Sequence, residues 1–310
     1  MTLSAKVKYY AFLLAKIVIA VMAFYFIYQK ISKQPLSEIG GAISAISFGQ
    51  YWLFVSAVIL SAVNWFCEIS KWKVLSKKIR NITFNESFRI VLSSLVASII
   101  TPNKIGEYGA KVTFYKKEMW KKVLGFNFFG NMMQLYVTLL MGLFFYYFLP
   151  VNVQAKVPGA VLPSVLLFFT LLSLFLFRKN SGLQLPWLSK RVEISVLSVL
   201  SINDRFRILA ISVIKYLAFS LQFLLLLLVF GVDSSVEYYS IITLNYFLIS
   251  ILPSIFFGDL LIRGSVAIFL FSLIGVNEIV VVTVVFIAWI FNFVIPALIG
   301  SLLILKTKQN

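Results

Sequence analysis

The chain has 310 residues, of which 61% are apolar and only 13% are charged. A soluble domain carries about twice that share of charge, so lipid must solvate much of this apolar surface. The chain has no histidine and one cysteine, which excludes histidine-based acid–base catalysis, an internal disulfide and clustered His or Cys metal sites. Glycine-rich phosphate loops of the Walker or Rossmann kind are absent from the sequence. We therefore expect a polytopic membrane protein that needs no cofactor.

The positions of the basic residues indicate membrane orientation rather than nucleic-acid binding, although the formal net charge is +17. Most Lys and Arg residues lie in clusters at residues 6–8, 71–89, 104–122, 178–207 and 306–308. The acidic residues of the loops between these clusters are Glu38, Asp233, Glu237 and Glu278. Because loops rich in Lys and Arg stay in the cytoplasm, the basic side is the inner one. We expect a protein of the plasma (inner) membrane with both termini in the cytoplasm and no nucleic-acid partner.

Apolar runs of membrane-spanning length recur along the chain. They cover residues 10–28, 48–66, 124–148, 159–177, 208–230 and 279–305. Each is close to the roughly 20 residues that a crossing helix needs. The first run is long and lacks a small-residue cleavage site, so we interpret it as a retained helix rather than a signal peptide. The sequence predicts an all-α polytopic membrane protein with about six to eight transmembrane helices.

Two further segments do not fit a simple crossing. Residues 88–101 are apolar but short, and basic clusters that favour the cytoplasm flank them on both sides. A re-entrant hairpin that enters from the cytoplasm and turns near residues 101–103 satisfies both constraints. Residues 240–276 lie between acidic outer loops and are interrupted at Pro253 and Gly258, which indicates a second hairpin that enters from outside. An ordinary pair of short helices is the alternative.

The two interruptions resemble each other in sequence. Residues 101–111 read TPNKIGEYGAK and residues 253–264 read PSIFFGDLLIRG, so both contain G-[DE]-x3-[KR] after a proline. Proline stops the incoming helix and glycine permits the turn. The acid then falls in the first turn of the outgoing helix, where the helix dipole favours it. We interpret the match as an internal repeat within one integral membrane domain, residues 1–310, with repeat-like halves at about 48–148 and 208–305.

Two opposed broken helices are typical of inverted-repeat transporters with a site at the bilayer midplane. In each interruption the acid and the base lie four residues apart, which pairs Glu107 with Lys111 and Asp259 with Arg263. One interpretation is that each pair only stabilises a helical turn. Because a charge at membrane depth costs roughly 2.5–3.5 kcal/mol, we favour a functional use. Lys111 and Arg263 would face a phosphate, and Glu107 and Asp259 would face an amine or titrate.

A polar stripe on a later helix supports this cavity. Asn127, Asn131, Gln134 and Thr138 follow helical spacing, and hydrogen bonding between helices is the alternative explanation to cavity lining. Outside the stripe, Asn64, Glu68 and Lys71 share one helix end, and Lys215 and Gln222 lie one heptad apart. The predicted headgroup-binding residues are Thr101, Pro102, Lys104, Gly106, Glu107, Lys111, Asn127, Asn131, Gln134, Pro253, Gly258, Asp259 and Arg263.

At these residues the chain resembles the lysylphosphatidylglycerol synthase transmembrane region, or flippase-like, family. The resemblance rests on the two interruption motifs and on residues 71–75, and as a topology it covers nearly the whole chain. Family members often have glycine and arginine where Asn103 and Lys104 stand, and the acid of the second motif has moved to Asp259. The resemblance implies a stand-alone membrane part without the soluble aminoacyl-transferase domain.

We expect a lipid translocase that moves a polar-headgroup phospholipid or a lipid-linked molecule between leaflets, without covalent chemistry. The expected partner is an anionic or zwitterionic membrane lipid or a lipid-linked intermediate, and a soluble lipid-modifying enzyme is a candidate second partner. One alternative is a membrane-embedded glycosyl- or acyl-transferase with Glu107 or Asp259 as base. The other is a non-catalytic membrane subunit that recruits a soluble enzyme through the basic loops.

Overall fold

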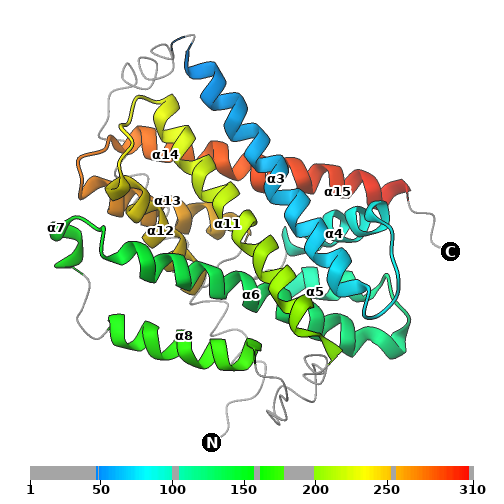
Figure 1. Ribbon diagram of the computed structural model, residues 1–310. Coiled ribbons are helices and arrows are strands. Elements are labelled where there is room, and N and C mark those ends of the chain that lie inside the picture. Colours follow the sequence, from blue (N-terminus) through cyan, green and yellow to red (C-terminus); the bar gives the residue numbers. More distant parts are fainter. Residues whose placement is uncertain are drawn as a thin grey trace, which may run out of the picture.

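The longest helices arise where apolar sequence runs without a break. The computed structural model describes residues 47, 49–99, 105–156, 161–177, 199–252 and 256–306, with the backbone alone at 99, 256–261 and 304–306. Every regular element in these ranges is a helix (Figure 1). The prediction of an all-α polytopic membrane protein is confirmed.

Four helical stretches are long and apolar enough to cross a bilayer. They are α3 (Gln50–Ser76), α6 (Trp120–Tyr146) with the 3₁₀ turn η2 (Lys117–Met119) before it, α11 (Ile202–Val229), and the continuous run of α14 (Glu278–Trp289), the π-helical segment η3 (Ile290–Val294) and α15 (Ile295–Lys306). The predicted run at 159–177 forms α8 (Val161–Phe177), which at 17 residues is shorter than a typical crossing helix. The predicted run at 10–28 lies outside the described residues.

Shorter helices flank both predicted interruptions. α4 (Phe84–Ile99) packs on α5 (Ile105–Val112), and α12 (Val236–Ile251) packs on α13 (Phe256–Ser272). α4 ends at Ile99 and α5 begins at Ile105, and α12 ends at Ile251 and α13 begins at Phe256; the predicted turns at 101–103 and at Pro253 lie outside the described residues. How deep these helix pairs enter the membrane stays a prediction.

The predicted role of glycine at the two interruptions is wrong. Gly106 and Gly258 lie inside the first turns of α5 and α13, not at the bend. Among the described residues, only Gly231 and Gly275 are glycines with a positive φ. A glycine is compatible with a helical turn as well as with a bend, so α5 and α13 can each begin before their glycine.

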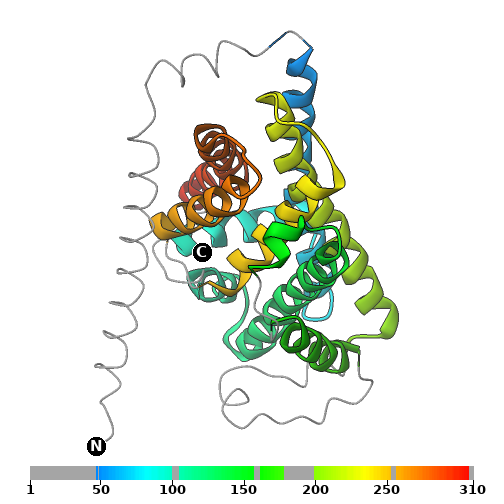
Figure 2. The same cartoon turned by 90° about the vertical axis from the view of Figure 1, so that its left-hand side faces the viewer.

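Helices of the first predicted half (48–148) pack against helices of the second (208–305), and the contacts are reciprocal. α3 lies along α11 in the middle of the bundle (Figure 1), and Figure 2 shows this pair along one side of the orange and red C-terminal helices. α15 packs on α4, and correspondingly α6 packs on α12. α3 contacts α6, just as α11 contacts α14. Two halves related by a two-fold axis would give this pairing, and the repeat itself stays a prediction.

Capping boxes fix the starts of two helices. The Thr83 hydroxyl accepts from the Glu86 backbone N–H at 3.2 Å, and the Glu86 carboxylate accepts from the Thr83 backbone N–H at 2.9 Å. This backbone hydrogen bond from Thr83 lowers the pKa of Glu86 below its ordinary value. Ser201 and Asp204 form the same motif at the start of α11, and Lys78 binds Asp204 at 2.7 Å. The ion pair ties the end of α3 to the start of α11.

Arg205 joins α8 to α11. Its guanidinium is buried and donates to the carbonyl oxygens of Leu176, the penultimate residue of α8, at 2.6 Å and of Leu200 at 3.3 Å. These bonds satisfy a terminal carbonyl that the α8 helix leaves open.

Replacing Arg205 with alanine is therefore expected to lower the free energy of unfolding by about 1.5–3 kcal/mol, the range for hydrogen bonds to charged groups. Thermal unfolding of the purified protein in detergent measures the loss. The control is Arg207→Ala, which removes the same charge from an exposed position two residues on. Equal melting temperatures for the two variants would contradict the assigned role.

Candidate functional site

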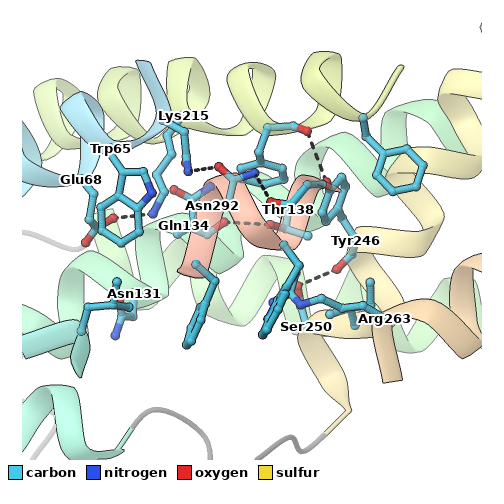
Figure 3. A pocket seen from close by; sticks show the side chains of 18 of the residues that line it. Trp65, Glu68, Asn131, Gln134, Thr138, Lys215, Tyr246, Ser250, Arg263 and Asn292 are labelled. Atoms are coloured by element: carbon cyan, nitrogen blue, oxygen red, sulfur yellow. Dashed lines mark hydrogen bonds and ion pairs between the residues drawn. The ribbon is translucent and has the colours of Figure 1, made fainter. Parts of the chain in front are cut away.

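A cavity of about 420 Å³ opens between the long helices and both pairs of short helices. This volume lies within the range of about 300–1,000 Å³ that small-molecule sites occupy. Its charged lining residues are Glu68, Glu107, Lys215 and Arg263. Its amide and hydroxyl lining residues are Asn64, Tyr108, Asn131, Gln134, Thr138, Asn245, Tyr246, Ser250 and Asn292 (Figure 3). The cavity therefore has a polar wall inside a bundle that is otherwise apolar.

Glu107 and Lys111 form the first predicted ion pair. The Lys111 Nζ atom lies 2.7 Å from Glu107 Oε1 and 2.6 Å from Asn127 Oδ1, and 4.6 Å from the centre of the Trp72 ring. Glu107 lines the cavity and keeps 16% of its side chain exposed, whereas Lys111 keeps 1%. Lys111 thus lies behind the cavity wall instead of facing a phosphate as expected, and Glu107 is the member of the pair that a ligand can reach.

Arg263 on α13 also lines the cavity, on the side opposite Glu68 in Figure 3. Asp259 lies one turn earlier on the same helix, but its side chain is outside the described residues, so the second ion pair stays a prediction. Of the other predicted site residues, Gly106 and Gly258 lie in the first turns of their helices. Thr101, Pro102, Lys104 and Pro253 lie outside the described residues.

The polar stripe of α6 both bonds to other helices and lines the cavity. Asn127 accepts from Lys111, and the Asn131 amide donates to the Tyr108 hydroxyl at 2.6 Å. Gln134 donates to the Ser212 carbonyl oxygen of α11 at 3.4 Å. Asn131, Gln134 and Thr138 line the cavity, and Asn127 does not. Both explanations for the stripe therefore hold, because Asn131 and Gln134 bond to other helices and also line the cavity.

The structure also brings together a charged cluster that was not among the predicted site residues. Glu68 Oε2 lies 2.7 Å from Lys71 Nζ on the same helix and 2.5 Å from Lys215 Nζ on α11. Their side chains are 12%, 3% and 19% exposed, respectively. The signal in the sequence is the presence of charged residues within or next to apolar runs, which marks positions that turn away from lipid.

Asn292 is the centre of a second group that sequence reasoning missed. Its amide donates to Gln222 Oε1 at 2.5 Å, and its Oδ1 accepts from Asn64 at 2.9 Å and from Ser61 at 3.2 Å. Asn292 belongs to the π-helical segment η3, and single π-helical turns occur frequently at functional sites. The signal available was one amide residue inside the apolar run 279–305.

Within the described part of the chain, no group of three or more His, Cys, Asp and Glu side chains gathers as a metal site requires. The described lining of the cavity combines charged, amide and aromatic side chains. Trp65, Phe219, Tyr246, Trp289 and Phe293 contribute rings to the wall. Such a wall can bind a polar group and exclude lipid tails from the charged side chains.

The sequence model of the family described as "Lysylphosphatidylglycerol synthase TM region" matches residues 13–300, which is nearly the whole chain. A search of curated proteins finds no match. Long apolar helices and the family match together make the chain an integral membrane protein. The protein belongs to the lysylphosphatidylglycerol synthase TM region family.

Proposed function

We propose that the protein is a lipid translocase, which moves a polar-headgroup phospholipid or a lipid-linked molecule between leaflets. One observation supports this most directly. The cavity takes ionised side chains from both interrupted helix pairs, Glu107 from α5 and Arg263 from α13, although most of the chain is apolar. Charged groups in a membrane segment are costly and usually face a substrate path or a wet cavity. Membership of a family named for the membrane region of a lipid-modifying enzyme agrees with a lipid as the substrate.

In this proposal the headgroup enters the cavity while the tails stay in the bilayer. The basic loops keep the ends of α3 and α6 that carry Lys77, Lys78, Lys121 and Lys122 in the cytoplasm, with both termini on that side of the inner membrane. The helix pairs α4–α5 and α12–α13 enter from opposite sides and meet at the cavity. Halves of related structure would then present the cavity to each leaflet in turn.

Both carboxylates described in the cavity wall fit a binding role better than a catalytic one. Glu68 is held by two lysines and Glu107 by one. In each case a lysine ammonium group already contacts the carboxylate that a base would use to accept a proton from a substrate. Transport of a headgroup needs no covalent step, so this arrangement suits a translocase.

Filling the cavity tests the proposal. Ser250 lines the cavity and is exposed, so Ser250→Trp is expected to fold and to reduce lipid transfer to the rate of protein-free vesicles. Proteoliposomes with fluorescent lipids in both leaflets measure transfer, because an impermeant quencher reaches only the outer leaflet. The control is Ser234→Trp, which adds the same ring to an exposed position away from the cavity.

Two results would count against a translocase. One is wild-type protein that leaves every tested headgroup in its original leaflet. The other is a new covalent lipid product formed in detergent, where no second leaflet exists, since only a transferase can make it.

A further inference from the structure

Resting on the proposed translocase function, we infer that the cavity selects an anionic headgroup. The phosphate would be held by Lys215, which belongs to an ionic cluster with Glu68 and Lys71, here called the Glu68 cluster. The cluster joins α3 to α11, the two helices at the centre of the bundle. It lies at the end of the cavity opposite Arg263 (Figure 3).

The composition of the cluster leaves one positive charge without a counter-ion inside it. Lys71 and Lys215 both contact a single carboxylate oxygen, Glu68 Oε2. Lys71 is almost completely buried, and Lys215 is the more exposed lysine and lines the cavity. Two ammonium groups therefore share one carboxylate, and an anion placed against Lys215 would balance the excess positive charge of the cluster. The ammonium group has three donors, so Lys215 can bind a phosphate oxygen while it keeps its bond to Glu68.

The other charged residues described in and behind the cavity wall do not cancel the net positive charge of the Glu68 cluster. Glu107 and Lys111 neutralise each other at 2.7 Å. Arg263 adds a further positive charge. An ionised Asp259 beside Arg263 would cancel that charge and still leave the excess of the Glu68 cluster. The cavity therefore attracts an anion more strongly than a neutral or zwitterionic group.

In the part of this wall that the structure describes, both carboxylates already contact ammonium groups, so a headgroup amine meets no open carboxylate there. Glu68 is bonded to two ammonium groups, and Glu107 to one, so an arriving amine would have to compete with lysines already in place. Amide side chains also line the cavity, with Asn64 one turn before Glu68 on α3 and Gln134 on α6. An amide N–H can donate to a phosphate oxygen, and an amide carbonyl oxygen can accept from a hydroxyl group. This arrangement fits a phosphate with a neutral, hydroxylated substituent better than one that carries an amine.

Binding by the purified full-length protein in detergent tests the inference. The probes are short-chain phosphatidylglycerol, short-chain phosphatidylcholine and soluble glycerol 3-phosphate. Wild-type protein is expected to bind phosphatidylglycerol more tightly than phosphatidylcholine, a comparison that needs no variant. Lys215→Gln should weaken phosphatidylglycerol binding by about tenfold or more, as expected for a lost charged hydrogen bond, and leave phosphatidylcholine binding unchanged. Lys215→Arg should restore the binding, and Lys117→Gln, at an exposed lysine, is the charge-matched control.

The variant Glu68→Gln tests whether the ligand group beside Glu68 carries a negative or a positive charge. It removes a negative charge beside the proposed phosphate, so phosphatidylglycerol binding should be retained or strengthened. If the carboxylate instead recognised an amine, Glu68→Gln would weaken binding and Lys215→Gln would not, and the inference would be overturned. Equal affinity of wild-type protein for the two lipids would also overturn it. Glycerol 3-phosphate that binds as tightly as the lipid, with the same dependence on Lys215, would show a soluble phosphate ligand and overturn the assignment to a lipid.

Transfer assays separate this inference from the proposed function. Binding of phosphatidylglycerol that depends on Lys215, without any transfer between leaflets, supports the anion site and contradicts the translocase. Transfer of both lipids at equal rates, insensitive to Lys215→Gln, supports the translocase and contradicts anion selection.

Discussion

Replacing Glu107 with alanine is expected to lower the free energy of unfolding by about 3–5 kcal/mol, the loss seen when one partner of a buried ion pair is removed. Lys111 would keep its charge with 1% of its side chain exposed and would retain only Asn127 and the Trp72 ring as partners. Thermal unfolding in detergent measures the effect.

The reason for this loss can be isolated with a second variant. The double variant Glu107→Leu with Lys111→Met removes both charges. It should recover most of the lost free energy of unfolding, because the destabilisation comes from the unpaired buried charge of Lys111. The exposed pair Arg80–Glu86, at 3.3 Å with both side chains more than 40% exposed, is the matched control. Glu86→Gln should cost less than about 1 kcal/mol, as is usual for surface ion pairs. Similar losses at Glu107 and Glu86 would show that burial does not set the cost.

Replacing Gly300 with alanine is expected to destabilise the protein, in contrast to most glycine-to-alanine changes in a helix. A Cβ atom at this position would lie 2.1 Å from the Leu92 carbonyl oxygen and 2.7 Å from its carbonyl carbon. The clashing atoms belong to the backbone of α4 and cannot rotate away, so α4 and α15 would have to move apart. Overpacking of this kind costs about 1–3 kcal/mol or more. The melting temperature and the fraction of monodisperse protein report the change.

Gly142 provides the control for this prediction, because it occupies the corresponding contact between α6 and α12. A Cβ atom there would meet only the Phe247 side chain, at an ordinary 3.6 Å. Gly142→Ala should therefore keep or raise stability, since alanine is favoured over glycine in a helix by roughly 0.5–1 kcal/mol. A change of the same sign at both positions would refute the close approach of α4 and α15.

Much of the fold could be predicted because lipid demands long apolar helices. The runs that became α3, α6, α11 and α14–α15 are visible in the sequence as stretches of sufficient length. The helices α4, α5, α12 and α13 end or begin within a few residues of Pro102 and Pro253, as expected because proline cannot continue a helix, while the prolines themselves lie outside the described residues. The position of the glycines could not be predicted, since a glycine is compatible with both a bend and a first helical turn.

The candidate site was predicted in part. Local spacing pairs Glu107 with Lys111 correctly, because residues four apart share a helical face. Spacing does not tell which member of the pair faces the cavity, and the Lys111 ammonium turns to Asn127 instead. The contact between Glu68 and Lys215 joins residues far apart in the chain, so it depends on the packing of α3 against α11. Asn292 was missed for the same reason, because its partners come from α3 and α11.

The π-helical segment η3 determines the rotational position of the side chains of α15, which follows it directly. One π-helical turn holds one residue more than the α-helical turn it replaces, and each residue of an α-helix turns the chain by about 100°. Had α14 continued into α15 as regular α-helix, the face that carries Gly300 would point about a quarter-turn away from Leu92. A single extra residue near Asn292 therefore decides both which amide reaches the cavity and which side of the last helix meets α4.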